Sequence, residues 1–459
     1  MDPIVTRRTL VLVIALFIVG ACGGQEGAKT ARDAQALLRG LHDAGSFGGA
    51  VILSRDGRIV YEGAFGRADR TRSFSLDTPA DGASLAKTAT AAAIWRLVAA
   101  GALALDDPVQ RYVAEFPYPD VSIRHLLSHT AGLPDYDPFQ PVLEGERPVD
   151  NLELQNVMRR QSPRPLFPPG SQFSYCNICY DTLALLIERV TRASYSEHVV
   201  KGMLAEAGAT TAFLRPARFA DWPGVRTLGF DSSRPDAAVF DVFDNEAIYG
   251  GSNIYFSARD LHAWARAWAE RRAVPADVWD QALVPARIDG HPSAMTLSSW
   301  YCATDRLRCY YTGHHQGFFN LVYWDAARNV TAVFVSNSTI APPLHPWFMR
   351  TLIALAEGGD ALPAPAVASD KDTQVDLVAV AGRYRIEGLG EVMIDAAGAT
   401  PVMQVGDGPR YQLYQVGYGW LYAPGVDAYL TLPLPVGETQ PRLSWNSVFL
   451  SGDGARISQ

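Results

Sequence analysis

A serine and a lysine three residues apart are the first candidates for chemistry in this sequence. Ser84 and Lys87 lie in the stretch 81–98, where Asp81, Gly82 and Ser84 are residue types that begin helices and an alanine-rich run favours helix propagation. Residues three apart share one face of a helix. An ammonium group and a helix N-terminus both stabilise an oxyanion on a nearby hydroxyl, so the pair predicts a nucleophile and its activator.

Two other interpretations of this serine are open from the residues alone. In the first, Ser84 is a helix cap and Lys87 a solvated surface residue. Against it, the chain holds four lysines among its 40 basic residues, and no other lysine follows a serine by three. In the second, residues 82–86 approximate the Gly-x-Ser-x-Gly turn of α/β-hydrolases, which needs a buried strand directly before it. Residues 73–79 are polar and contain a proline, so no such strand is expected.

Length, composition and charge limit the classes of function. The chain has 459 residues, of which 48% are hydrophobic and 19% charged, as in a globular protein with room for two or three domains. The net charge is −8, and no basic stripe is interleaved with aromatic residues. Both features argue against a nucleic-acid partner.

The N-terminal residues have the pattern of an export signal. Arg7 and Arg8 precede an apolar run from Leu10 to Val19, which has the length of a signal-peptide core and is short for a membrane span. Residues 19–22 (Val-Gly-Ala-Cys) resemble the lipobox of bacterial lipoproteins. We therefore expect a signal peptide over residues 1–22, a tether over 23–32 and a lipid on Cys22 that anchors the protein to a bacterial membrane, on the periplasmic side or at the outer membrane. The alternative is a cleaved soluble signal, which also implies export.

Four further cysteines are compatible with disulfides in an exported protein. Cys302 and Cys309 flank a turn in a hairpin-like stretch, so a cross-strand bridge between them is expected. Cys176 and Cys179 have thioredoxin-like spacing without a matching strand–loop–helix setting, and their state is left open. A zinc site that uses all four cysteines is the less favoured alternative.

Two histidines have the spacing of a helical metal pair. His125 and His129 are four residues apart in the stretch 121–136, but no glutamate follows the first histidine and no third ligand is evident. We therefore expect these to be core or capping histidines, and no metal site.

The order of the other elements indicates a mixed α/β domain followed by a small β domain. Helices are expected over 30–44, 180–190, 258–271 and 347–356, and strands over 48–54, 58–65, 310–318, 321–324 and 330–336, with a hairpin turn at Asp56-Gly57. Residues 357–372 are linker-like, and 373–459 show short alternating strands without a helix, which predicts a small β-barrel or sandwich.

Several ordered stretches together resemble the serine β-lactamase and penicillin-binding-protein-like hydrolases, specifically the class C β-lactamase branch with its esterases and D-amino-acid peptidases. Residues 84–87 resemble the family's Ser-x-x-Lys, and residues 175–177 (Tyr-Cys-Asn) its Tyr-x-Asn, with cysteine where serine is common. Residues 315–317 (His-Gln-Gly) stand where members carry Lys-Thr-Gly or His-x-Gly. Residues 125–133 and 250–261 are similar to framework segments, and the likeness covers roughly residues 33 to 356.

The resemblance implies a fold and a set of roles. The fold is a β-lactamase/transpeptidase-like α/β sandwich beside a helical domain, here over 33–356, and residues 373–459 resemble an appended lipocalin-like domain. Ser84 would be the nucleophile, and Lys87 and Tyr175 would share the proton transfers, since a tyrosine beside an ammonium loses its proton more readily. The substrate-binding residues would be Asn177, His315, Gly317 and Phe318, the last through a backbone oxyanion hole shared with Ser84. No metal or organic cofactor is needed.

The function expected from this resemblance is an exported serine hydrolase that forms an acyl-enzyme on Ser84. Its substrates would be small molecules or peptides, among them cell-wall-derived ones: esters, D-amino-acid amides or peptides, or β-lactams. Where family members carry a lysine, whose fixed positive charge binds a substrate carboxylate, this chain has His315, which is mostly neutral at pH 7 when unperturbed. Esterase or peptidase activity is therefore favoured over β-lactamase activity, unless an arginine or His314 supplies the missing charge. The alternative is a lipoprotein that binds cell-wall peptide or β-lactam, without turnover or trapped as an acyl adduct.

Overall fold

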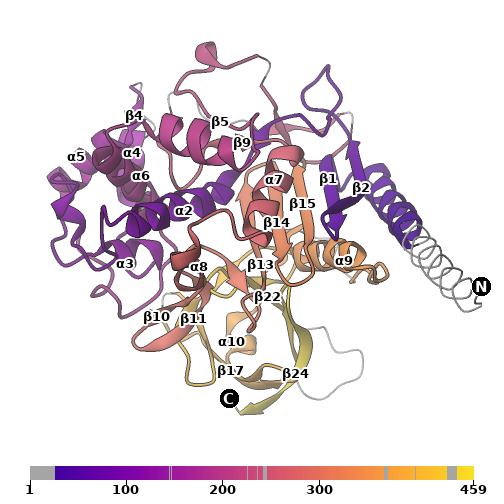
Figure 1. Ribbon diagram of the computed structural model, residues 1–459. Helices are drawn as coiled ribbons and strands as arrows, with labels where there is room; N and C mark the ends of the chain where they lie inside the picture. Colours follow the sequence, from indigo (N-terminus) through magenta and orange to yellow (C-terminus); the bar gives the residue numbers. More distant parts are fainter. Residues whose placement is uncertain are drawn as a thin grey trace, which may run out of the picture.

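The structure, a computed structural model, describes residues 26–143, 145, 147–224, 226–234, 236–240, 246–365, 371–398, 400–431 and 442–458. Its centre is an antiparallel eight-stranded sheet (Figure 1). In spatial order its strands are β10 (Pro285–Ile288), β11 (His291–Thr296), β12 (Tyr301–Cys302), β13 (Arg308–His315), β14 (Phe318–Asp325), β15 (Val330–Ser336), β1 (Gly49–Arg55) and β2 (Arg58–Phe65). The hairpin turn expected at Asp56-Gly57 joins β1 to β2, with φ of 52° and 73° at its two residues.

Helices cover both faces of this sheet, which explains why β14 and β15 are buried along their whole length. Phe334 contacts Phe348 of α9 (His345–Glu357), with ring centroids 5.0 Å apart. On the opposite face Trp324 stacks on Trp268 of α7 (Ala258–Ala269), 5.9 Å away. Because side chains alternate along a strand, a buried sheet of this kind needs an almost continuous apolar run.

Most of the other helices form a second region beside the sheet, drawn mainly in purple and magenta in Figure 1, with α8 in salmon. They are α2 (Ala86–Ala99), α3 (Ile123–Leu127), α4 (Gln140–Leu143), α5 (Asn151–Gln161), α6 (Asn177–Thr191), η4 (Ser196–Leu204) and α8 (Ala276–Ala282). Single helical turns are η1 (Ala83–Leu85), η2 (Val109–Arg111), η3 (Asp137–Phe139), η5 (Phe219–Asp221) and η6 (Pro342–Leu344). Short strand pairs are β3 (Ala80–Asp81) and β5 (Phe213–Leu214) on β9 (Ile254–Phe256), β4 (Val149–Asp150) with β8 (Glu246–Ala247), and β6 (Gly229–Phe230) with β7 (Val239–Phe240).

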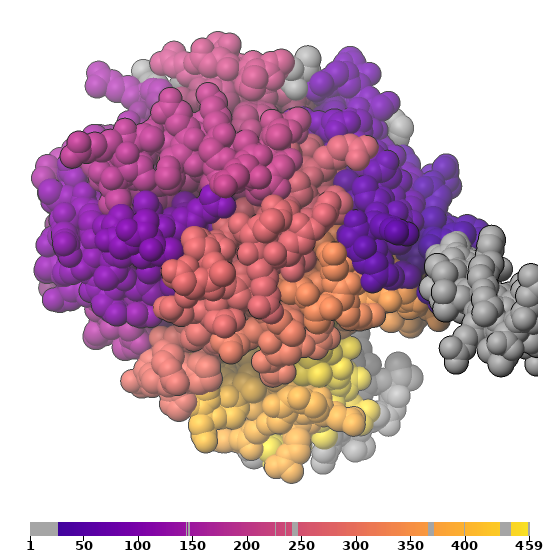
Figure 2. All heavy atoms as spheres, viewed as in Figure 1, coloured from indigo at the N-terminus to yellow at the C-terminus, as the bar shows by residue number. Residues whose placement is uncertain are grey.

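The C-terminal part is an antiparallel nine-stranded near-barrel, packed beneath the main sheet in Figures 1 and 2. In spatial order it contains β19 (Arg410–Gln412), β18 (Val402–Val405), β17 (Gly390–Asp395), β16 (Gly382–Ile386), β24 (Ser451–Ser458), β23 (Arg442–Asn446), β22 (Ala428–Thr431), β21 (Leu421–Ala423) and β20 (Tyr414–Gln415). The two end strands, β19 and β20, are neighbours in sequence, so the sheet curls back on itself. This agrees with the all-β domain predicted there.

The structure corrects three local predictions. The tether expected over 23–32 is helical from residue 26, in a helix that continues to residue 43, and Thr30 is buried against Leu355. Ser84 makes no capping hydrogen bond, and Asp81 is in β3 instead of a helix start, because its backbone pairs with Tyr255 of β9. The C-terminal domain, expected to lack helices, has one turn, α10 (Leu377–Val380), capped by the Asp376 carboxylate.

Both cysteine pairs form disulfides. Cys302 and Cys309 are opposite one another on β12 and β13, with an S–S distance of 1.99 Å, as expected from the hairpin pattern. Cys176 and Cys179, whose state the sequence left open, are also bonded. Because all four cysteines are disulfide-bonded, none can serve as a thiolate ligand, and the alternative of a four-cysteine zinc site is wrong. The expected signal peptide and Cys22 lie outside the described residues. Among the described helices, none has both the length and the apolar character that crossing a membrane requires.

Candidate active site

Ser84 lies on a tight turn between a short strand and helix α2. The preceding residue, Ala83, has a positive φ of 47°, a strained backbone conformation for an alanine. Its amide donates to the Asp81 carboxylate at 2.8 Å, which helps to hold the turn. Strand β13 passes so close that a Cβ on Gly313 would lie 2.1 Å from the Gly82 carbonyl oxygen. The turn therefore places a half-buried serine hydroxyl between β13 and α2.

The Lys87 ammonium is completely buried and lies one turn beyond the serine. Its Nζ donates to three acceptors: Ser84 Oγ at 3.2 Å, Asn177 Oδ1 at 2.8 Å and the Gly251 carbonyl oxygen at 2.8 Å. An ammonium group has three protons, and a buried one is stable only when they are satisfied. The predicted contact between Ser84 and Lys87 is confirmed, although Ser84 lies in the helical turn η1 that precedes α2.

The Tyr175 hydroxyl is the second group that contacts the serine. It donates to Ser84 Oγ at 3.0 Å, although the two residues are 91 positions apart in sequence. Lys87 Nζ lies 4.9 Å from the centre of the Tyr175 ring. The structure thus places a lysine and a tyrosine, both predicted from sequence, within hydrogen-bonding distance of the predicted serine.

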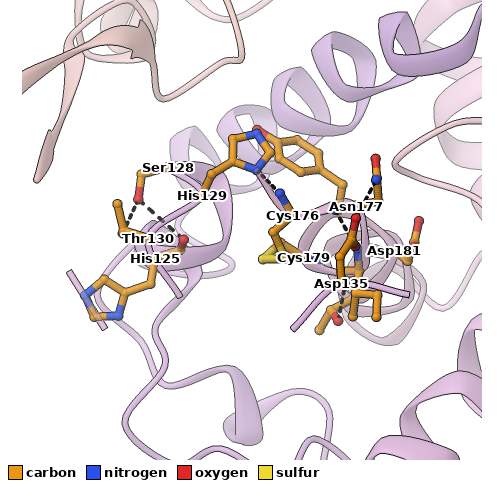
Figure 3. Close-up of a disulfide and its surroundings, with 12 residues drawn as sticks. His125, Ser128, His129, Thr130, Asp135, Cys176, Asn177, Cys179 and Asp181 are labelled. Carbon is orange, nitrogen blue, oxygen red and sulfur yellow. Dashed lines mark hydrogen bonds between the residues drawn. A yellow bond between two sulfur atoms is a disulfide. The ribbon is translucent and has the colours of Figure 1, made fainter. Parts of the chain in front are cut away.

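Asn177, at the first position of α6, is fixed by a carboxylate that the sequence analysis missed. Its Nδ2 donates to Asp135 Oδ2 at 2.7 Å, and its backbone amide donates to Asp135 Oδ1 at 2.9 Å. This orientation leaves Asn177 Oδ1 free to accept from Lys87. Burial raises the pKa of Asp135 above its ordinary value. Figure 3 shows Asp135 beside Asn177 at the start of the helix.

A second missed carboxylate, Asp181, lies one turn further along α6. Its Oδ2 accepts from the Tyr136 hydroxyl at 2.6 Å and its Oδ1 from the Gly251 amide at 3.0 Å. Burial raises the pKa of Asp181 to about 7. Because Gly251 offers its carbonyl to Lys87 and its amide to Asp181, this carboxylate positions one of the three acceptors of the ammonium.

The two histidines of the expected pair have different structural roles. His125 forms a capping box with Ser122 at the start of α3. His129 is fully buried, stacks on the Tyr175 ring at 4.6 Å and accepts a hydrogen bond from the Cys176 amide at Nδ1, 3.0 Å away (Figure 3). Burial, and after it the Lys87 ammonium, hold the pKa of His129 well below its ordinary value, so it is neutral. It is a core histidine that supports Tyr175.

The end of β13 forms the other wall of the site. His315 is partly exposed, and its Nδ1 lies 2.9 Å from Oδ2 of the buried Asp81. Gly317 is in the turn to β14 with a φ of 79°, and a Cβ there would lie 2.9 Å from Gly229. Phe318 follows, opposite His315 in the strand pair. The backbone oxyanion hole of Ser84 and Phe318 stays a prediction.

His314 cannot supply the charge that His315 lacks. Along β13 alternate side chains face opposite sides of the sheet, so His314 faces α9, where its ring lies 5.6 Å from that of His345. Within the part of the chain that the structure describes, no group of three or more metal-ligating side chains is arranged to hold an ion.

Comparison with known proteins supports this description. A family model described as Beta-lactamase matches residues 34–355. Esterase EstB of Burkholderia gladioli is 33% identical in an alignment of 221 positions that covers 43% of this chain and 51% of that protein. The chain's matches to its first three curated relatives span between 39% and 64% of those proteins' own lengths, less than two thirds.

Solved structures share the fold at lower identity. The octameric penicillin-binding protein homologue from Pyrococcus abyssi aligns with a TM-score of 0.61 and 18% identity, covering 93% of this chain and 99% of that one. A class C β-lactamase aligns with a TM-score of 0.55 and 17% identity, covering 69% and 92%. Because the family model spans the serine turn, helix α6 and both strands that close the site, this chain belongs to the Beta-lactamase family and has its α/β fold.

Proposed function

We propose that this chain is a serine hydrolase that acts through an acyl-enzyme on Ser84. The observation that carries the proposal is the position of Ser84 Oγ, 3.2 Å from Lys87 Nζ and 3.0 Å from the Tyr175 hydroxyl. A serine hydroxyl is a weak nucleophile until an adjacent group accepts its proton. Both neighbours are within the distance that proton transfer requires.

The proposed reaction has two halves. In the first, Ser84 Oγ attacks the substrate carbonyl carbon and passes its proton to the Lys87–Tyr175 pair. That pair then protonates the departing alcohol or amine as its bond to the carbonyl breaks. In the second half water attacks the acyl carbon, gives a proton to the same pair, and Ser84 Oγ leaves and is reprotonated. Backbone amides of Ser84 and Phe318 would stabilise the oxyanion in both halves.

The charges around His315 favour substrates without a terminal carboxylate. His315 is paired with the buried Asp81 carboxylate. With Asp81 ionised, the pair carries no net positive charge whether or not the imidazole is protonated. Lys87 is fully buried with three acceptors. We therefore propose esters or uncharged amides as substrates, in line with the esterase name of the Burkholderia gladioli relative.

We expect kcat/KM for a short-chain p-nitrophenyl ester to exceed that for a chromogenic cephalosporin, which carries a carboxylate. His315→Lys adds a fixed charge and should move this ratio about tenfold toward the cephalosporin. Gln281→Lys, which adds the same charge on the exposed surface of α8, is the matched control and should leave the ratio unchanged. Faster turnover of the cephalosporin by the wild type, or an unmoved ratio in His315→Lys, would refute the charge argument.

We also propose that Cys22 carries lipid and anchors the hydrolase to a bacterial membrane. The support is the sequence pattern alone, an apolar run followed by Val-Gly-Ala-Cys at residues 19–22. Mass spectrometry of the mature N-terminus should show a diacylglycerol-modified Cys22 in the membrane fraction, and Cys22→Ser should release the protein. An unmodified mature N-terminus beyond Cys22 contradicts this proposal.

A further inference from the structure

A second tyrosine contacts the proposed catalytic tyrosine. The hydroxyl of Tyr311, on β13, lies 3.0 Å from the Tyr175 hydroxyl. The alternation of strand side chains places Tyr311, Gly313 and His315 on the face of β13 that lines the site. Tyr311 is 2% exposed, so its hydroxyl exchanges little with water. Among the described residues, Tyr175 is its sole hydrogen-bond partner.

We propose that Tyr311 is a positioning residue that donates a hydrogen bond to the Tyr175 oxygen and so stabilises it in its deprotonated form. The inference rests on the proposed function, because it concerns the proton transfer between Ser84 and Tyr175. When the Tyr175 hydroxyl donates to Ser84, its oxygen lone pairs accept from Tyr311. After Tyr175 has lost its proton, the oxygen accepts from both neighbours.

Tyr311 is suited to this role because it keeps its own proton. Burial, and after it the neighbouring Tyr175, hold the pKa of Tyr311 well above its ordinary value. The titratable groups that face this pair are Lys87, from α2, Tyr180, from α6, Tyr301, from β12, and His129, which follows α3 and stacks on the Tyr175 ring. Of these, Lys87 lies over the Tyr175 ring, with its Nζ 4.9 Å from the ring centre.

The C-terminal domain contacts Tyr301, the residue that packs on the Tyr311 ring. The Tyr301 ring stacks on Tyr311, with centroids 5.8 Å apart and planes 22° from parallel. The Tyr301 hydroxyl in turn donates to the carbonyl oxygen of Pro424, in the near-barrel. The position of the Tyr311 ring is therefore fixed by a contact that crosses between the two domains.

The test is the pH profile of ester hydrolysis by Tyr311→Phe, which keeps the ring and removes the hydroxyl. We expect the acid limb of kcat/KM to move to higher pH by about one unit and kcat near pH 7 to fall about tenfold, with KM little changed. The matched control is Tyr323→Phe, which removes a buried hydroxyl from the same sheet, where it donates to Glu357 at 2.8 Å. Its melting temperature should fall, but its pH profile should match the wild type.

A double-substitution cycle gives a second readout. Because Tyr311 acts through Tyr175, adding Tyr311→Phe to Tyr175→Phe should cost less than twofold in rate. The inference is overturned if Tyr311→Phe keeps the wild-type profile and rate, if Tyr323→Phe shifts the profile equally, or if the two substitutions are independent. Activity that survives Ser84→Ala would instead refute the proposed function. If activity is lost in Ser84→Ala but is unchanged in Tyr311→Phe, this inference is refuted and the proposed function is not.

Discussion

Ser84→Ala is expected to reduce ester hydrolysis at least about a thousandfold while leaving the protein folded, because the substitution removes the proposed nucleophile. The serine makes no capping bond that its loss would break. Lys87 would still donate to Asn177 and to the Gly251 carbonyl, so its buried charge stays paired. Steady-state kinetics with a chromogenic ester and a thermal melt check both parts.

Ser84→Thr is a useful companion, since it keeps a hydroxyl but crowds the turn. It should retain part of the activity that Ser84→Ala loses. A Ser84→Ala variant with wild-type kcat would mean that another residue is the nucleophile, whereas a fall in melting temperature of more than about 10 °C would mean that lost activity reflects unfolding.

Lys87→Met should cost about a thousandfold or more in kcat, and Tyr175→Phe a similar factor, because the two act as one proton-transfer unit with Ser84. The double variant should be little worse than either single one. Lys87→Met also leaves Asn177 Oδ1 and the Gly251 carbonyl without their buried donor, so a lower melting temperature is expected as well.

The control for this series is Lys201→Met, which removes an exposed lysine from η4. It should keep wild-type kinetics and nearly wild-type stability. If Lys87→Met retained more than a tenth of wild-type kcat, or if the losses of the two single variants multiplied in the double variant, the shared role of Lys87 and Tyr175 would be wrong.

The sequence predicted the parts of the fold that local patterns determine. Strands β14 and β15 were predictable from their apolar runs, because a strand that is covered on both faces is apolar along its whole length. The Asp56-Gly57 turn needs two positive φ angles, which these residue types tolerate. Strand β3 was not predictable from the sequence, because its two residues are extended only through pairing with β9, which lies far along the chain.

The candidate site was predictable only where residues belong to a recognisable motif. Ser84, Lys87, Tyr175 and Asn177 were found in this way, and the structure brings them together. Asp135 and Asp181 were missed because each acts through residues that tertiary packing places beside it. One usable signal was overlooked: a period of two counted back from His315 places Tyr311 on the same face of β13.

The disulfide beside the site shows a different limit. The spacing of Cys176 and Cys179 fits both a bonded and a free pair, and only the fold decides between them. Cys176 directly follows Tyr175 and is the N-cap residue of α6. Its Sγ accepts a hydrogen bond from the Cys179 amide at 3.1 Å. The bond thus ties the residue between Tyr175 and Asn177 to the first turn of the helix.

The most direct test of the acyl-enzyme account is covalent labelling of the intact protein. Incubation with a fluorophosphonate probe should add one probe mass, peptide mapping should place it on Ser84, and Ser84→Ala should stay unlabelled. Lys87→Met should label far more slowly than wild type, because its serine lacks the activating neighbour. A wild-type protein that takes up no probe, or an adduct that maps to another residue, would contradict the central claim that Ser84 is the activated nucleophile.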